Sequence, residues 1–218
     1  MVNARVCALL VLLAAVAPLT GGATRARAHP HVWIAVETEV LYDKGAFTGL
    51  RHRWIFDEFY TAMAIEGLDK NGDGTYDREE LAELAKINVE GLKEFAYFTH
   101  PKRADEAVKI GEARDYFLEH KDGILSLYFT VPFERPIEPD RKGLTFSVYD
   151  PTYFIAFDFA KTAEPVKLAA AAPKRCGLKV GVPQAEGDNA KALSEAFGAL
   201  GAISAGGVKI VAIECNGP

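Results

Sequence analysis

One stretch of twelve residues places oxygen-bearing side chains at regular intervals: Asp69-Lys70-Asn71-Gly72-Asp73-Gly74-Thr75-Tyr76-Asp77-Arg78-Glu79-Glu80. Ca²⁺ takes six to eight oxygen ligands from carboxylates, amides and backbone carbonyls, and loops that bind it supply them at positions 1, 3, 5, 7, 9 and 12. The stretch has a suitable residue at each of these positions: Asp69, Asn71, Asp73, Thr75, Asp77 and Glu80. This spacing predicts a calcium-binding loop.

The details of the stretch agree with that chemistry, and residues 57–93 resemble the EF-hand family. Gly74 occupies position 6, where the chain turns sharply, and Glu80 would bind the ion with both carboxylate oxygens. Apolar residues at helical spacing flank the loop on both sides and predict a helix–loop–helix unit. The alternative is a solvated acidic turn. EF-hands usually occur in pairs, and because no second loop exists here, we expect a structural clamp with an extracellular-type affinity of about 10⁻⁴–10⁻³ M.

The start of the chain predicts export. Arg5 precedes an apolar run at residues 6–19, and Ala26-Arg27-Ala28 is an A-x-A cleavage pattern; together these are the parts of a signal peptide. A transmembrane anchor is the alternative, but the run is shorter than the roughly 20 apolar residues that a bilayer requires. We therefore predict a signal peptide at residues 1–28 and a soluble periplasmic mature chain without membrane insertion.

Cleavage after residue 28 would make His29 the first residue, followed by Pro30 and His31. A free α-amine and two imidazoles within three residues are nitrogen ligands suited to Zn²⁺, Ni²⁺, Co²⁺ or Cu²⁺. The alternative is a pair of exposed histidines without a ligand. The roles of three further histidines stay open, with a surface or core role preferred over ligation: His52, His100 and His120.

The cysteines and the charge narrow the class of protein further. Cys176 and Cys215 would remain after cleavage, and an even number of cysteines in an exported chain predicts a disulfide; a thiol metal site is the alternative. The whole chain has a net charge of −5, and the signal segment removes three arginines from it (Arg5, Arg25 and Arg27). An acidic chain of this kind is poorly suited to nucleic acid.

Hydrophobic patterning predicts an α+β, mostly β fold. Alternation over residues 32–56, interrupted by Asp43-Lys44-Gly45, predicts a hairpin. Further strands are expected at residues 95–99, 108–120, 123–132, 143–149 and 154–159, with a hairpin turn at Lys121-Asp122-Gly123. We expect a β-sandwich-like core at residues 29–168 that includes the helical insertion 57–93. Residues 169–218 are expected to form a strand–helix–strand unit, with its helix at 188–200 and its ends tied by the disulfide.

A resemblance covers most of the mature chain. The segments His29-Pro30-His31-Val32-Trp33-Ile34, Trp54-Ile55-Phe56-Asp57-Glu58 and Tyr149-Asp150-Pro151-Thr152-Tyr153-Phe154, with the late cysteine pair, are similar to the bacterial Domain of Unknown Function 1007 family. That resemblance implies a periplasmic accessory protein that works beside a nickel/cobalt-type permease, in some members for zinc acquisition. It supplies no catalytic site.

Three classes of function follow. The preferred one is a metal-binding accessory protein that captures or delivers zinc, nickel or cobalt to an inner-membrane permease and also binds calcium. The second is a calcium-stabilised structural or interaction module. The third is an enzyme with a copper histidine brace at His29, which we do not favour because the sequence lacks a catalytic motif. Asp57 and Glu58 are adjacent and therefore point apart, and Asp150 before Pro151 is expected to form a turn rather than a ligand.

Overall fold

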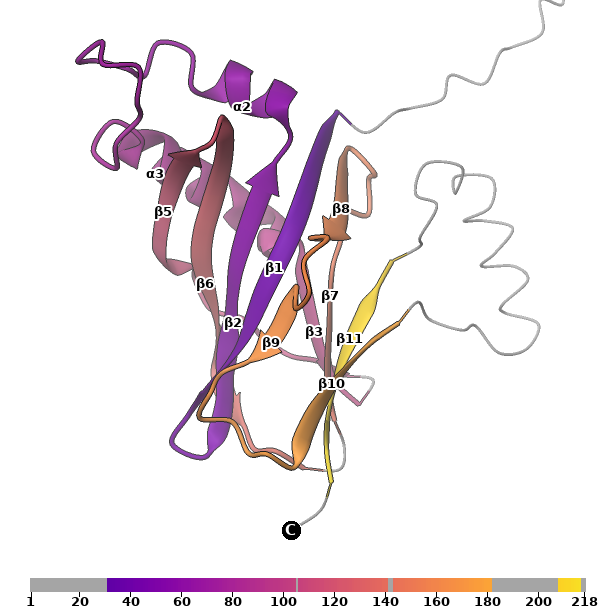
Figure 1. Cartoon of the computed structure of the whole chain (residues 1–218). Coiled ribbons are helices and arrows are strands. Elements are labelled where there is room, and N and C mark those ends of the chain that lie inside the picture. Colours follow the sequence, from indigo (N-terminus) through magenta and orange to yellow (C-terminus); the bar gives the residue numbers. More distant parts are fainter. Residues whose placement is uncertain (1–30, 105, 141–142, 182–207, 217–218) are drawn as a thin grey trace, which may run out of the picture.

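Two β-sheets form the framework of the protein (Figure 1). The structure is a computed structural model that describes residues 31–104, 106–140, 143–181 and 208–216. The six-stranded sheet has the order β5-β6-β2-β1-β8, with β9 also paired to β1. Its strands are β1 (Val32–Asp43), β2 (Ala46–Phe56), β5 (Arg114–Lys121), β6 (Ile124–Ile137), β8 (Ile155–Phe159) and β9 (Val166–Leu168).

The second sheet has five strands in the order β10-β11-β7-β3-β4. They are β3 (Thr99–Arg103), β4 (Glu106–Ala107), β7 (Leu144–Val148), β10 (Cys176–Gly181) and β11 (Ile210–Cys215). Buried side chains of both sheets belong to one apolar cluster, with Trp54 and Phe129 from the first sheet and Phe146 and Ile213 from the second. The expected mostly β, sandwich-like α+β fold is therefore confirmed.

Turn chemistry explains the two hairpins of the first sheet. Lys44 and Gly45 have φ values of 48° and 88°, and Asp122 and Gly123 have 53° and 78°. Two consecutive residues with positive φ form the tight turn whose twist matches antiparallel strands. Both hairpin turns expected from the sequence are present. At Gly49 in β2, a Cβ atom would lie 2.5 Å from the Val131 carbonyl oxygen, so only glycine fits the close approach of β2 and β6 at that point.

The helical insertion lies between β2 and β3 and contains α2 (Glu58–Ala64), α3 (Ala82–Leu92) and a 3₁₀ segment, η1 (Lys93–Phe98). Its first helix is shorter than the apolar spacing predicts, because α2 ends at Ala64, before Leu68. The strand expected at residues 95–99 is wrong. Ala96, Tyr97 and Phe98 all have positive φ, which is incompatible with an extended strand, and β3 begins only at Thr99.

Most of the other expected strands are present, but their first and last residues differ from those expected from the sequence. The strand expected at residues 108–120 begins at Arg114, and the short strands β4 and β9 were not expected. β1 also pairs in parallel with both β8 and β9, an arrangement that hydrophobic alternation does not reveal. None of the helices in the described ranges has the length and apolar character needed to cross a bilayer.

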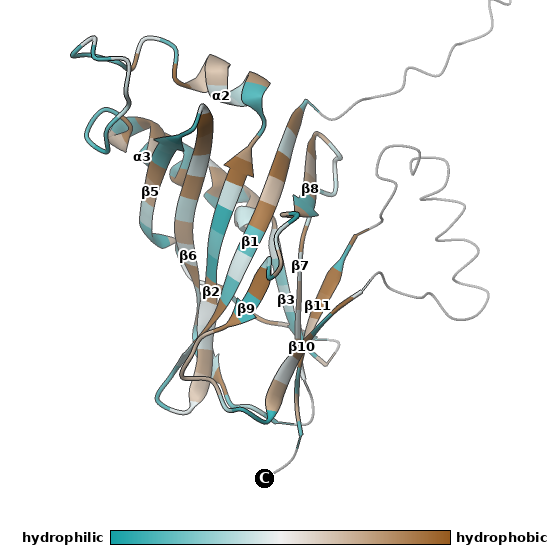
Figure 2. Ribbon diagram, in the orientation of Figure 1, coloured by the Kyte–Doolittle hydropathy of each residue, from teal (hydrophilic) through white to brown (hydrophobic). Residues whose placement is uncertain are grey.

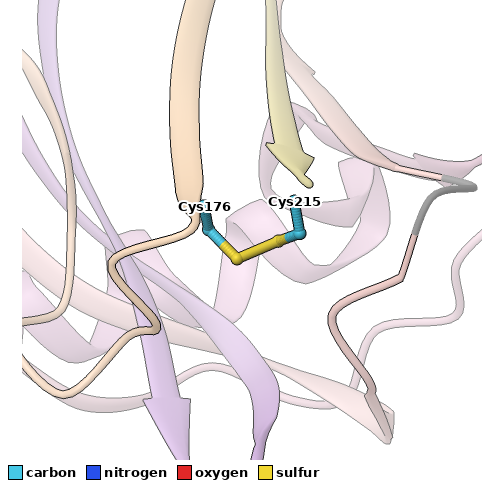
Figure 3. Close-up of a disulfide and its surroundings, with 2 residues drawn as sticks. All are labelled: Cys176 and Cys215. Carbon is cyan, nitrogen blue, oxygen red and sulfur yellow. A yellow bond between two sulfur atoms is a disulfide. The ribbon is translucent and has the colours of Figure 1, made fainter. Parts of the chain in front are cut away.

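The C-terminal strands belong to the second sheet. β10 and β11 are antiparallel with Cys176 directly opposite Cys215, and β11 also pairs with β7. The predicted disulfide joins these two cysteines (Figure 3). The segment that we expected as a separate unit thus shares its sheet with strands of residues 29–168. The helix expected at residues 188–200 lies outside the described residues.

Candidate functional site

The acidic loop at residues 69–80 connects α2 to α3 beside the first sheet (Figure 1), and Figure 2 shows it as a hydrophilic segment. Asp69, at its first position, accepts hydrogen bonds from three backbone N–H groups of the loop. The Gly72 and Asp73 amides donate to Oδ1 at 2.7 and 3.2 Å, and the Gly74 amide donates to Oδ2 at 3.0 Å. Gly74 has a φ of 78°, the left-handed conformation that glycine adopts without strain. Asp69 therefore organises the first half of the loop.

The middle of the loop is held by Asp73. Its Oδ1 accepts hydrogen bonds from the Thr75 hydroxyl at 2.6 Å and from the Thr75 amide at 2.8 Å. The Asn71 side-chain amide donates to Oδ2 at 3.1 Å. These bonds, with the Thr75 hydroxyl first, lower the pKa of Asp73 below its ordinary value. The hydrogen bonds therefore favour the carboxylate form of Asp73.

Glu80 ends the loop with its carboxylate turned inward, and the residue is only 8% exposed. Its Oε1 accepts a hydrogen bond from the Lys70 amide at 2.8 Å, and its Oε2 accepts one from the Asp77 amide at 3.1 Å. Asp77 in turn accepts hydrogen bonds from the amides of Glu79 and Glu80 at 2.8 and 2.9 Å. One buried carboxylate thus joins the second position of the loop to the ninth.

The donor set suits a hard cation. Carboxylate and amide oxygens are the ligands that Ca²⁺ prefers, and each carboxylate has about four lone-pair sites, so an oxygen that accepts an N–H retains capacity for an ion. In the described part of the chain no three His, Cys, Asp or Glu side chains are close enough together to hold a metal. The loop carboxylates instead point at backbone amides.

Two aromatic contacts fix the loop against the edge strand β5. The Tyr76 ring meets the His120 ring edge-on, with centroids 4.9 Å apart. The Arg78 guanidinium lies 3.7 Å from the centroid of the Phe117 ring, a cation–π contact. Leu81, directly after the loop, is 1% exposed in the core. The loop is therefore connected to the sheet through Tyr76 and Arg78, neither of which is a predicted calcium ligand.

The N-terminal histidines lie where the described chain begins. His31 is exposed, its backbone N–H donates to the Phe154 carbonyl at 2.9 Å, and its ring centroid is 4.7 Å from that of Phe154. The parallel pairing of β1 with β8 produces this contact. His29 lies outside the described residues, so the relation of the two predicted ligands stays a prediction.

The remaining histidines each have a separate environment. His52 is completely buried, with Nδ1 2.9 Å from the Thr38 hydroxyl and Nε2 3.3 Å from the Thr99 hydroxyl. Burial lowers the pKa of His52 to about 3. Because the Thr99 hydroxyl donates to the Tyr97 carbonyl, it accepts the Nε2 hydrogen, and Nδ1 accepts from Thr38. Of the two roles preferred over ligation, a surface role and a hydrogen-bonded core role, His52 has the second.

His100 and His120 lie on different sheets. The His100 Nε2 donates to the Tyr149 carbonyl at 3.2 Å, and burial lowers the pKa of His100. His120 lies on β5 against Tyr76. Each of these side chains thus has a contact of its own that involves no other histidine.

Asp57 and Asp150 both accept backbone hydrogen bonds where an element begins or the chain turns. Asp57 is the N-cap of α2: its Oδ1 accepts the Tyr60 amide at 2.8 Å, and its Oδ2 accepts the Trp33 amide at 2.8 Å. Asp150 accepts hydrogen bonds from Thr152 and from the Ile155 amide. The turn expected at Asp150 is confirmed.

Comparison with known proteins places the chain in one family. The model of the family described as "protein of unknown function (DUF1007)" matches residues 14–205, and the chain belongs to that family. An uncharacterized protein of Haemophilus influenzae is 23% identical over 133 residues, which are 61% of this chain and 64% of that protein, just under two thirds of its length. An uncharacterized 15.5 kDa protein from the trpE 3′ region of Spirochaeta aurantia is 30% identical over 100 residues, 46% of this chain and 70% of that protein.

Proposed function

We propose that the protein is a periplasmic metal-binding accessory protein whose loop 69–80 binds one Ca²⁺ and whose N-terminal histidines bind a transition metal. The observation on which the calcium part rests is the inward carboxylate of Glu80, bonded to amides from both halves of the loop. A bidentate carboxylate at the last loop position is what a calcium loop of this length uses to close around its ion.

Charge supports a cation in this loop. Five of its twelve residues are acidic and two are basic, and the guanidinium of one base, Arg78, lies over Phe117. Carboxylates close together in one short loop repel each other, and a bound divalent cation removes that repulsion. Calcium bound in this way would stabilise the connection between α2 and α3 and, through Tyr76 and Arg78, the edge of the first sheet.

The transition-metal part rests on the exposed His31, directly before β1, and on the role that the resemblance of the sequence implies. With His29 exposed as a new N-terminus, the α-amine and two imidazoles would bind Zn²⁺, Ni²⁺, Co²⁺ or Cu²⁺. We propose that zinc, nickel or cobalt is captured there and delivered to an inner-membrane permease. The proposed role is binding rather than catalysis.

Titration of the processed protein with each of the four metals, with calcium present in excess, tests this role. We expect one site that is weakened in His29→Ala and in His31→Ala and by one extra residue ahead of His29, because the extra residue separates the α-amine from its imidazole. Binding should also weaken as the pH falls, since the ligands must be deprotonated. His120→Ala is the matched control and should bind like the wild type.

Equal binding by the wild type and a His29→Ala, His31→Ala double variant would reject the transition-metal site. The protein would then be a calcium-stabilised structural or interaction module, which is the alternative that loop 69–80 favours on its own.

A further inference from the structure

The strongest feature that the proposed metal sites do not use as ligands is a group of large apolar side chains exposed at one end of the molecule, beside His31. Trp33 on β1 is 52% exposed, and Phe154 before β8 is 56% exposed. The other tryptophan of the chain, Trp54, is 1% exposed in the core. A group of exposed tryptophan and phenylalanine side chains is typical of a binding surface, because exposed apolar groups do not stabilise the fold.

Helix α2 adds two more apolar side chains to this end. Phe59 is 76% exposed and Met63 is 58% exposed, and residues four apart lie on the same face of a helix. The opposite face of α2 is buried: the Thr61 hydroxyl accepts the Leu125 amide of β6 at 3.1 Å, and Ile65 after the helix lies in the core. Phe59 and Met63 therefore point away from the sheet.

Backbone hydrogen bonds bring these elements together. The Asp57 amide donates to the Trp33 carbonyl at 3.1 Å, and the Trp33 amide donates to the Asp57 carboxylate. The His31 amide donates to the Phe154 carbonyl at 2.9 Å. Figure 1 shows α2 and the start of β1 at the same end of the molecule. We call this region, made of Trp33, Phe59, Met63 and Phe154, the aromatic end.

The segments that carry the aromatic end contain acidic but no basic residues, and two of these acids, Asp158 and Glu37, pair with Lys209 and Arg53 from neighbouring segments. The segments 31–43, 54–69 and 144–160 contain no lysine or arginine. Glu58 and Glu66, which precede Phe59 and follow Met63 in the sequence, are exposed, and Asp57 lies at the start of α2. Any partner that fits this region must bring large apolar side chains and positive charge together.

We propose that the aromatic end binds a partner protein through a segment that presents large apolar side chains flanked by lysine or arginine. The acidic rim repels an anionic lipid surface, which attracts basic segments instead. It also repels a second copy of the same end, because like charges would face each other. This binding surface requires neither the calcium loop nor the N-terminal metal site, so it goes beyond the proposed function and can fail without affecting it.

Photo-crosslinking in the intact native host tests the proposal on the full chain. A benzophenone amino acid replaces Phe59 in one strain and Met63 in another, and Val180 on the edge strand β10, which is 49% exposed, is the control position. We expect Phe59 and Met63 to give the same protein adduct, with a crosslinked peptide that contains apolar residues and lysine or arginine. Val180 should not give that adduct.

Charge reversal supplies the second arm. Glu58→Lys with Glu66→Lys should reduce the adduct at least about fivefold, because like charges then face each other, whereas Glu134→Lys on β6 should leave it unchanged. Four outcomes would overturn the proposal: no adduct from either position, the same adduct from Val180, attachment to lipid or to a second copy of this chain, or an adduct insensitive to the reversal.

Discussion

The acidic loop 69–80 and the aromatic end differ in whether their characteristic side chains have partners within the protein. In the loop, the carboxylates of Asp69, Asp73 and Glu80 each accept backbone amides from the loop itself. At the aromatic end, Trp33 and Phe59 are more than half exposed. The loop satisfies its carboxylates with its own backbone amides, whereas the aromatic end leaves apolar side chains exposed to water.

This difference indicates what each region requires. Under the proposed function the carboxylates of the loop require a small cation, because a bound divalent ion removes the repulsion between them. An exposed apolar group gains free energy only when another surface removes it from water. Calcium should therefore change the stability of the protein, while the aromatic end should contribute to association and little to folding.

Removal of the disulfide should produce the largest effect and leave both regions unchanged. The bond closes a separation of 39 residues, for which loop-closure entropy gives roughly 4 kcal/mol of stability. We expect a Cys176→Ser, Cys215→Ser double variant to lose about that much free energy of unfolding, measured by denaturant titration, with unchanged calcium affinity. A large change in calcium affinity would show that the second sheet and the loop are coupled.

Acid should lower the free energy of unfolding through the buried side chain of His52. The pKa of His52 is about 3 in the folded protein and 6.5 when the side chain is free in water, so the unfolded chain takes up this proton first as the pH falls. Neutral His52 therefore does not lower the free energy of unfolding above about pH 6.5. Below that pH, proton uptake by the unfolded chain lowers the free energy of unfolding by about 1.4 kcal/mol per pH unit, which amounts to about 2 kcal/mol by about pH 5.

The His52→Gln variant isolates this term, because glutamine does not titrate and can still hydrogen-bond to the threonines. Its free energy of unfolding should fall less steeply between about pH 6.5 and pH 5 than that of the wild type. Identical pH slopes in the two proteins would exclude His52 as the source of the acid sensitivity.

Loss of the α2 cap should have a smaller effect on stability and should show whether the calcium affinity of the loop depends on the aromatic end. Asp57 bonds both to the Tyr60 amide and to the Trp33 amide. Asp57→Ala should cost about 1 kcal/mol of stability, raise hydrogen exchange at those two amides, and leave calcium affinity near its original value. Glu58→Gln is the control, since Glu58 makes no cap bond. A fall in calcium affinity in Asp57→Ala alone would mean that the loop depends on α2.

The two regions also differ in what the sequence reveals. Every proposed calcium ligand lies within twelve consecutive residues, so spacing alone identifies them. The hairpin turns at Lys44 and Asp122 are equally local. The aromatic end is built from three segments far apart in the chain, and the pairing of β1 with β8 and with β2 and the Asp57 cap bring them together.

Apolar spacing predicts that helices flank the loop, and α2 and α3 are present, but it does not tell which helix face is covered. Phe59, Met63 and Ile87 are each more than half exposed, and α2 buries Thr61 instead. At residues 96–98 the apolar and aromatic composition favours a strand, whereas positive φ values turn the chain there. Composition reports which side chains prefer burial and does not report which of them the tertiary structure covers.

The most direct test of the central claim is a calorimetric calcium titration of Glu80→Gln against Glu79→Gln. Both changes remove one negative charge from the loop, but only Glu80 points inward, bonded to the Lys70 and Asp77 amides. We predict that Glu80→Gln weakens calcium binding at least tenfold, about 1.4 kcal/mol, and that Glu79→Gln stays close to the wild type. Equal calcium binding by all three proteins, or no calcium binding by the wild type, would contradict the assignment of loop 69–80 as a calcium site.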